Sequence, residues 1–185
     1  MIFIIWGIVF VTGIWIISVY NNLTALRLRV QNAWHQINVQ LKRRYDLIPN
    51  LVETVKGYLQ FEQDTLQRVI DARGKAMVSR GVKQSAEAEG ALNESLGKVF
   101  ALMENYPDLK SNKNVLDLQE ELATTENQIA FARQYYNDLV TQFNTKQQVF
   151  PGNLIASFFK FQPSEFFLVA DAEAALPKVN LSLPR

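Results

Sequence analysis

The chain has 185 residues, of which 48% are apolar and 20% are charged, with 8 glycines and 6 prolines. These proportions exclude disordered, collagen-like and low-complexity proteins, and the length fits one domain. Nineteen Lys and Arg against 18 Asp and Glu leave a formal charge of +1, so no broad cationic face is available and nucleic-acid binding is not expected.

The first twenty residues predict a transmembrane anchor. Ile2–Tyr20 contain no charged residue, and nineteen helical residues span roughly 28 Å, about the thickness of the hydrocarbon core of a bilayer. A cleaved signal peptide is one alternative, but no Lys or Arg precedes the run and Ser18–Asn22 offer no small-residue cleavage site. A buried core helix is the other, but bulky apolar residues occupy all faces. Arg27 and Arg29 follow the span, so we expect a single-pass protein of the cell membrane with a cytoplasmic bulk domain and Met1 outside.

The residues after Tyr20 predict that the same helix continues beyond the membrane. A stripe with helical spacing is formed by Leu23, Leu26, Val30, Ala33, Ile37 and Leu41. Pro49 lacks a backbone N–H and disfavours the α conformation of Ile48. We therefore expect this helix to end in a turn at Tyr45–Ile48, and a kink within a longer helix is the alternative.

Two further helices are predicted before residue 107. The first covers residues 50–79 and buries Leu51, Val55, Tyr58, Leu66, Val69, Ala72 and Ala76. Residues 79–90 hold two Gly, two Ser and mixed charge, which predicts a loop. The next helix presents Leu92, Leu96, Val99, Met103 and Tyr106 on one face. Pro107 is expected to end it, and residues 107–114 form a polar connection.

The clearest pattern in the chain predicts a long fourth helix. Its seam consists of Val115, Leu118, Leu122, Thr125, Ile129, Ala132, Tyr136, Leu139 and Phe143. The steps alternate between three and four residues, which is typical of a helical bundle or coiled coil. We therefore predict an all-α protein, in which an N-terminal transmembrane helix (residues 1–20) continues into an antiparallel four-helix-type bundle with long helices (residues 21–149).

Half of the twelve phenylalanines lie within eighteen residues near the C-terminus. They are Phe150, Phe158, Phe159, Phe161, Phe166 and Phe167. Because the fourth helix is expected to return toward the bilayer, we predict that residues 150–185 pack on the membrane-proximal end of the bundle. These side chains either fill the bundle end, insert into the membrane interface, or contact a partner or a second copy.

Motifs of known catalytic and cofactor sites are absent from the sequence. It contains no Gly-rich phosphate loop, no nucleophile elbow and no cysteine. Its one histidine is His35, and the residue three positions before it is Asn32. The Glu-x-x-His motif of a di-iron bundle needs Glu at that position. We predict no catalytic residue, no cofactor and no metal. Hydrolysis by carboxylates such as Glu62 and Glu126 is the least favoured alternative, because they would have to converge in an open pocket.

Polar residues beside the predicted seams are candidates for a structural network. The candidates are Arg44, Asp46, Asn50, Glu62, Glu126 and Arg133. Glu126 and Arg133 lie seven positions apart on one helix face, next to the seam. Glu62 falls in an apolar stripe, so we expect it to meet an arginine of the first or fourth helix. The other three surround the predicted first turn, where they supply caps or, alternatively, a basic docking site.

Three stretches of the chain resemble the LemA family of bacterial membrane proteins. They are NAWHQINVQLKRRYDLIPNLVETVKGY (residues 32–58), YPDLKSNKNVLDLQEELATTENQIAFARQYYNDLVTQFNT (residues 106–145) and FPGNLIASFFKF (residues 150–161). The resemblance extends over nearly the whole chain. It implies a single-pass protein with a helical-bundle domain and no assigned catalytic activity. It also implies an envelope setting, since members recur beside membrane proteases and one branch occurs in magnetosome membranes.

Together these observations favour a non-enzymatic, membrane-anchored scaffold or adaptor. Its expected partners are the lipid bilayer, through Ile2–Tyr20, and an unidentified protein at the membrane. That protein is either a second copy of the chain or a membrane protease. The alternative function is therefore an accessory or regulatory subunit of a membrane protease or another envelope system.

Overall fold

All regular secondary structure in the described part of the chain is helical. The computed structural model describes residues 2–59 and 61–169. Its helices are α1 (Ile2–Lys56), α2 (Gln63–Val78), α3 (Gly81–Met103), α4 (Pro107–Lys110), α5 (Lys113–Gln148) and α6 (Gly152–Phe158). The predicted all-α class is confirmed.

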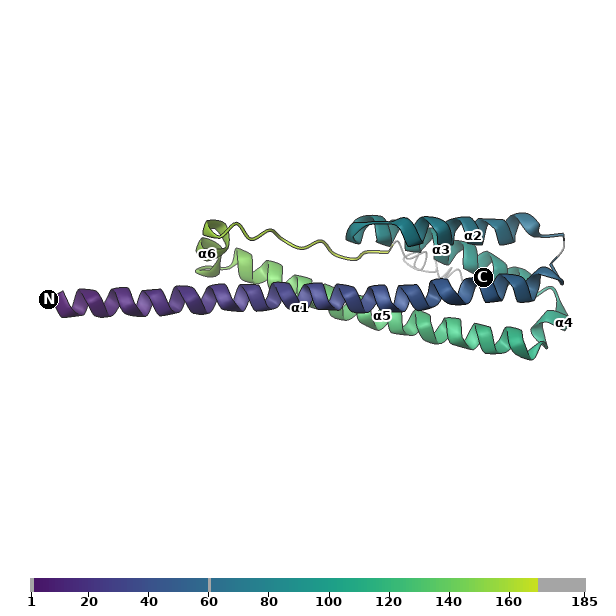
Figure 1. The fold of residues 1–185 in the computed structure, drawn as a ribbon, viewed down its shortest axis with the longest axis horizontal. Coiled ribbons are helices and arrows are strands. Elements are labelled where there is room, and N and C mark those ends of the chain that lie inside the picture. The colour runs from purple at the N-terminus through teal and green to yellow at the C-terminus, as the bar shows by residue number, and fades with distance from the viewer. Residues whose placement is uncertain (1, 60, 170–185) are drawn as a thin grey trace, which may run out of the picture.

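Helix α1 joins an exposed apolar segment to the centre of the bundle. Its 55 residues form one helix about 80 Å long, and in Figure 1 its N-terminal part projects beyond all other elements. The most apolar stretch of 18 residues in α1 has no buried residue. From Leu23 to Val55, by contrast, the residues on the face turned toward the other helices belong to the core. The exposed segment therefore has the length and surface of a membrane anchor.

The predicted turn at Tyr45–Ile48 is wrong, because α1 runs through Pro49 to Lys56. Proline cannot donate to the carbonyl four residues earlier, which is that of Tyr45. The Nε of Arg73 in α2 donates to this carbonyl at 2.6 Å. The helix beyond the proline is also held by buried apolar side chains, namely Leu51, Val52 and Val55.

The connections between the shorter helices also differ from the prediction. The predicted loop at 79–90 is reduced to Ser79 and Arg80, after which Gly81, at φ 78°, makes the reversal into α3. The predicted helix over 50–79 is divided, because residues 50–56 belong to α1 and α2 begins at Gln63. Tyr58, expected in the core, is 43% exposed in this break.

Helix α5 confirms the predicted fourth helix. Its buried residues include Val115, Leu122, Thr125, Ile129, Tyr136, Leu139 and Phe143, with Leu118 and Ala132 partly buried. Asn112 caps its start by accepting a hydrogen bond from the N–H of Asn114 at 3.0 Å. The helix packs antiparallel along α1 (Figure 1), while α2 and α3 flank only the half of the bundle far from the apolar segment.

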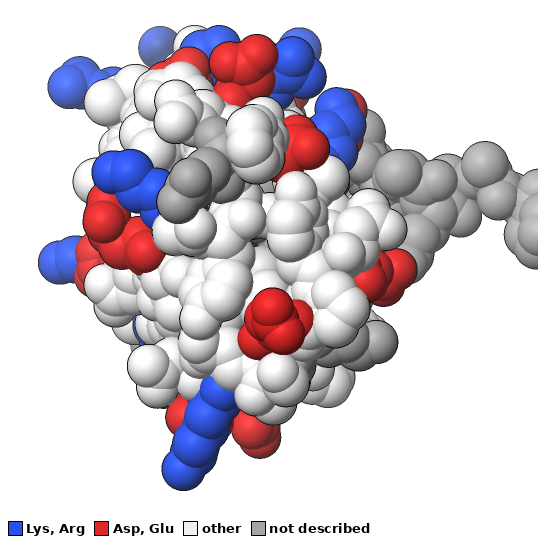
Figure 2. Space-filling model, turned by 90° about the vertical axis from the view of Figure 1, so that its right-hand side faces the viewer, with Lys and Arg blue, Asp and Glu red and all other residues white. Residues whose placement is uncertain are grey.

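Charged side chains at the far end of the bundle lie mostly around its edge (Figure 2). Figure 2 views this end and shows a mainly uncharged centre with most Lys, Arg, Asp and Glu side chains toward the rim. Phe61, in the connection between α1 and α2, is 94% exposed.

The Phe-rich segment begins at the opposite end. Helix α6 lies beside α1 and the end of α5, and residues 159–169 then run back along the bundle without regular secondary structure (Figure 1). Residues 170–185 of the predicted C-terminal segment lie outside the described residues.

Candidate functional site

A buried arginine joins three helices at the centre of the bundle. Arg44 of α1 is 2% exposed and pairs with the carboxylates of Glu89 in α3 and Glu126 in α5. Its Nη1 also donates to the side-chain oxygen of Asn93 at 2.6 Å. The hydroxyl of Tyr45, the next residue, donates to Glu89. One guanidinium therefore sets the mutual register of α1, α3 and α5.

Burial dominates the electrostatics of this Arg44 cluster. Loss of hydration lowers the pKa of Arg44, and the charge of Glu126 opposes that shift. Burial likewise raises the pKa of Tyr45, with Arg44 acting in the opposite direction. Because desolvated charges are costly unless each has a partner, the cluster specifies one arrangement of the helices more than it adds stability.

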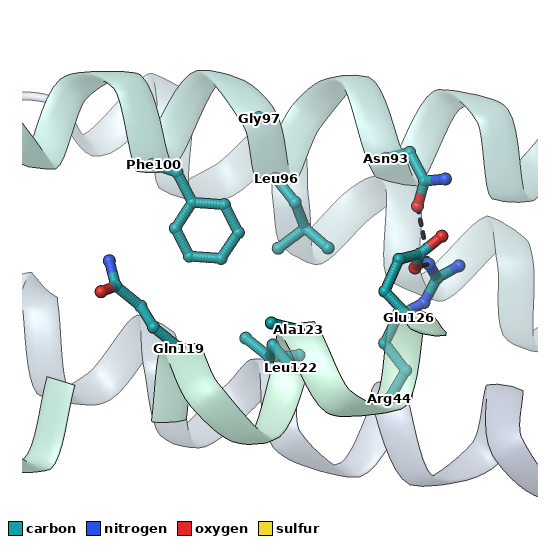
Figure 3. Close-up of a pocket in the computed structure, with 9 residues that line it drawn as sticks. All are labelled: Arg44, Asn93, Leu96, Gly97, Phe100, Gln119, Leu122, Ala123 and Glu126. Carbon is teal, nitrogen blue, oxygen red and sulfur yellow. Dashed lines mark hydrogen bonds and ion pairs between the residues drawn. The ribbon is translucent and has the colours of Figure 1, made fainter. Parts of the chain in front are cut away.

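An apolar groove opens between α3 and α5 next to the cluster. Its volume is about 450 Å³, and its lining consists of Arg44, Asn93, Leu96, Gly97, Phe100, Gln119, Leu122, Ala123 and Glu126 (Figure 3). Glu126, with a side chain 47% exposed, brings the cluster to the groove surface. The groove can hold apolar groups beside one polar end.

The predicted polar candidates are only partly brought together. Arg44 and Glu126 meet in the cluster, whereas Asp46 and Asn50 are exposed on the outer side of α1. Glu62 precedes α2 as its half-buried N-cap residue, without a capping side-chain bond, and does not line the groove. Arg133 borders a separate shallow pocket with Asn137.

The sequence pattern does not predict Glu89 and Asn93 as partners of Arg44. Both lie in or just after residues 79–90, the stretch predicted as a loop. The signal that indicates Glu89 is the spacing of Ser85, Glu89, Leu92 and Leu96, which continues the helical stripe of α3 toward its N-terminus.

The six phenylalanines of the C-terminal segment occupy different environments. Phe167 is 1% exposed, and its ring centroid lies 5.4 Å from that of Trp34. Phe161 is partly buried between the rings of Tyr20 and Phe143, with the guanidinium of Arg27 5.4 Å from its centroid. The others are exposed to differing degrees, namely Phe150, Phe158, Phe159 and Phe166.

The end of the apolar segment meets this Phe-rich region directly. The ring of Tyr20 lies 4.7 Å from that of Phe159. Lys146 of α5 reaches the side-chain oxygen of Asn22 at 2.5 Å. A pocket there is bordered by Trp15, Ser18, Val19, Asn22, Leu23, Lys146 and Val149–Gly152. Helix α6 thus lies at the level where the apolar run ends.

Comparison with known proteins finds one family model and several similar proteins. Its sequence matches the model of the LemA family over residues 33–181. It is 27% identical over 154 residues to Protein LemA of Metamycoplasma hominis, covering 83% of this chain and 70% of that protein. It is 23% identical over 174 residues to Magnetosome protein MamQ 2 of Paramagnetospirillum magneticum, covering 80% of this chain and 64% of that protein. Against MamQ of Magnetospirillum gryphiswaldense the identity is 22%, with the same coverage.

The family match and the fold agree over most of the chain. The chain spans just under two thirds of the length of the magnetosome relatives, and the residues matched by the family model include most of the bundle and the Phe-rich segment. With the family model matched across 33–181, the chain belongs to the LemA family.

Proposed function

We propose that this protein is a non-enzymatic scaffold that holds a helical bundle at the membrane and acts through contacts with other proteins. The observation that carries the proposal is the continuity of α1, in which an exposed apolar segment and the central core helix are one element. No flexible linker separates them, so the bundle is held at a defined height and orientation. The magnetosome proteins among its relatives support a role at a membrane.

Lipid contact is proposed to extend beyond the spanning segment. Three large apolar side chains are exposed beside the end of the apolar run: Phe150, just before α6, is 78% exposed, and Leu154 and Phe158 of α6 are 58% and 78% exposed. Large apolar side chains at this level support insertion into the membrane interface. Arg27 and Arg29 follow the span and support a cytoplasmic bundle.

Protein contact is proposed for the bundle itself. Phe61 and Phe131 are 94% and 73% exposed on the bundle, and aromatic residues are enriched at protein–protein interfaces. The chemistry of the Arg44 cluster also favours a structural role, because each carboxylate there is engaged by the guanidinium.

Crosslinking in native membranes followed by mass spectrometry tests this proposal. Three proteins are compared: the full chain, a variant with residues 2–20 replaced by an unrelated apolar helix, and that anchor alone. A scaffold predicts one set of proteins crosslinked to both bundle-bearing chains and absent with the anchor alone. Recovery of the same proteins with all three would contradict the proposal. A membrane protease in the bundle-dependent set would assign the accessory role.

A further inference from the structure

The side of the bundle between α3 and α5 stays open along the apolar groove. Helix α3 packs on α2, and α5 packs on α1. Between them lies a space of about 450 Å³ that is bordered by the side chains of Leu96, Phe100 and Leu122 (Figure 3). Gly97 and Ala123 border it too and add little bulk. The groove therefore has room for an apolar side chain, which would cover its lining from water.

The extended C-terminal segment follows α5 toward this groove. The side chain of Asn144 makes two hydrogen bonds with the backbone of Ser164, both at 2.9 Å. The side chain of Asn137 makes two with the backbone of Phe167, at 3.0 and 3.2 Å. The two asparagines lie seven positions apart and Ala123 lies fourteen further on, so all three lie along one side of α5. The segment is thus held on the side of α5 that continues into the groove.

The last described residue of this segment contacts α3 at the near end of the groove. Val169 is partly buried, and a Cβ on Gly90 would lie 3.7 Å from its Cγ1. Gly90 is followed at helical spacing by Asn93, Gly97 and Phe100, which line the groove. The chain therefore leaves Val169 beside the first position of the α3 stripe that borders the groove.

The sequence after Val169 supplies one large apolar side chain within reach. The next six residues read ADAEAA, and Leu176 follows them. The seven steps from Val169 to Leu176 span about 10.5 Å in a helix and about 23 Å in an extended chain. Along α3, Gly97 and Phe100 lie about 10.5 and 15 Å beyond Gly90. Leu176 can therefore reach the apolar part of the groove in either conformation.

We propose that the groove between α3 and α5 is the docking site of residues 170–176 of the same chain, with Leu176 as the side chain that fills it. The match to the family model runs through residue 181, so these residues belong to the same family domain as the bundle. Groove and segment are parts of one chain, so the segment is present at high effective concentration. Docking removes the groove lining and Leu176 from water together.

This docking makes the groove an internal contact of the chain. A partner protein reaches Leu96 and Phe100 only after Leu176 has left. The protein contacts proposed for the scaffold therefore fall on other exposed side chains, such as Phe61 and Phe131. The docking itself does not depend on the scaffold role.

Two engineered cysteines test the docking in the full-length chain, which has no cysteine of its own. Ala175→Cys is combined with Gly97→Cys in the groove, or with Gly74→Cys on α2 as the matched control. Both glycines are exposed, and a Cβ at either has no atom of the described residues within 4 Å. With a short bismaleimide, we expect a link within one chain that is several-fold more abundant with Gly97→Cys than with Gly74→Cys.

Substitutions on each side of the contact show whether Leu176 docks. Leu176→Ser should reduce the link to Gly97→Cys to the control level, whereas Ala174→Ser should leave it unchanged. Ala123→Glu places a charge in the groove and should reduce the link as Leu176→Ser does. Thr124→Glu, at the next exposed position of α5, should leave it unchanged.

Three results would overturn the inference. Equal links with Gly97→Cys and Gly74→Cys would show that the segment does not occupy the groove. A link that forms only between differently tagged copies would place a neighbour's segment there instead. A link that survives both Leu176→Ser and Ala123→Glu would show that the segment passes the groove without docking. All three are measured on the purified chain, whereas a failed scaffold would show only as missing partner proteins in native membranes.

Discussion

The guanidinium of Arg73 donates to the backbone carbonyl of Tyr45, the carbonyl that Pro49 leaves without its helical donor. A bond between residues 28 positions apart thus replaces one that the helix cannot make. It allows α1 to continue for a further seven residues and to bury Leu51 and Val55. This contact therefore supports the last two turns of α1, at the end of the bundle far from the apolar segment.

Replacing Arg73 with Met should destabilise the fold by about 1–3 kcal/mol, because the partly buried carbonyl of Tyr45 loses its charged donor. In a Pro49→Ala background the loss should be much smaller, because residue 49 then supplies the helical N–H. Urea unfolding of the wild type, both single variants and the double variant measures this coupling. Equal losses in the two backgrounds would show that Arg73 does not compensate for Pro49.

Arg44→Met should destabilise the protein by about 3–5 kcal/mol, because Glu89 would stay buried without its cation. Adding Glu89→Leu should recover most of the loss, since it removes the stranded charge. Arg43→Met is the matched control, because Arg43 is exposed on the adjacent position, and it should change stability by less than about 0.5 kcal/mol. Urea denaturation of the four proteins distinguishes these outcomes.

Tyr136 should make the fold less stable as the pH rises above about 10. Burial, together with the charge of Glu165, raises the pKa of Tyr136 to about 12 from an ordinary value of 10.0. Between these values the unfolded chain loses the phenolic proton and the folded chain keeps it, so ionisation favours unfolding.

The matched comparison is Tyr136→Phe, which lacks the titrating group. At neutral pH it should be less stable by about 1 kcal/mol, because the bond to the Glu165 carbonyl is lost. This deficit should shrink as the pH rises from 9 to 11. Urea midpoints measured across that range check the prediction, and a constant deficit would contradict it.

Phe158 should enter a membrane interface when the full chain is in a bilayer. Phe158→Cys carrying an environment-sensitive fluorophore should emit at shorter wavelength in vesicles, because the label leaves water. Phe131→Cys is the control, since Phe131 on α5 is similarly exposed at 73% against 78%, and its label should emit as in water. Water-like emission from both labels would contradict interfacial insertion by α6.

The features that the sequence determined are those carried by local patterns. Nineteen uncharged residues mark the apolar segment, and the three-and-four spacing from Val115 to Phe143 marks α5, because each pattern reports which face of a single helix is apolar. The phenylalanines likewise marked a distinct C-terminal segment. These features are independent of remote partners, so they could be predicted with their residues.

The tertiary structure alone decided the features that depend on distant residues. Pro49 by itself favours a turn, but in the folded chain Arg73 donates to the carbonyl that the proline leaves free. The polar stretch around Glu89 by itself favours a loop, but in the folded chain Glu89 lies in a helix and pairs with the buried Arg44. The two hydrogen bonds between the side chain of Asn137 and the backbone of Phe167 join residues 30 positions apart and have no local sequence signature. These hydrogen bonds and ion pairs join groups that only packing brings together, so the pattern within one helix does not specify their partners.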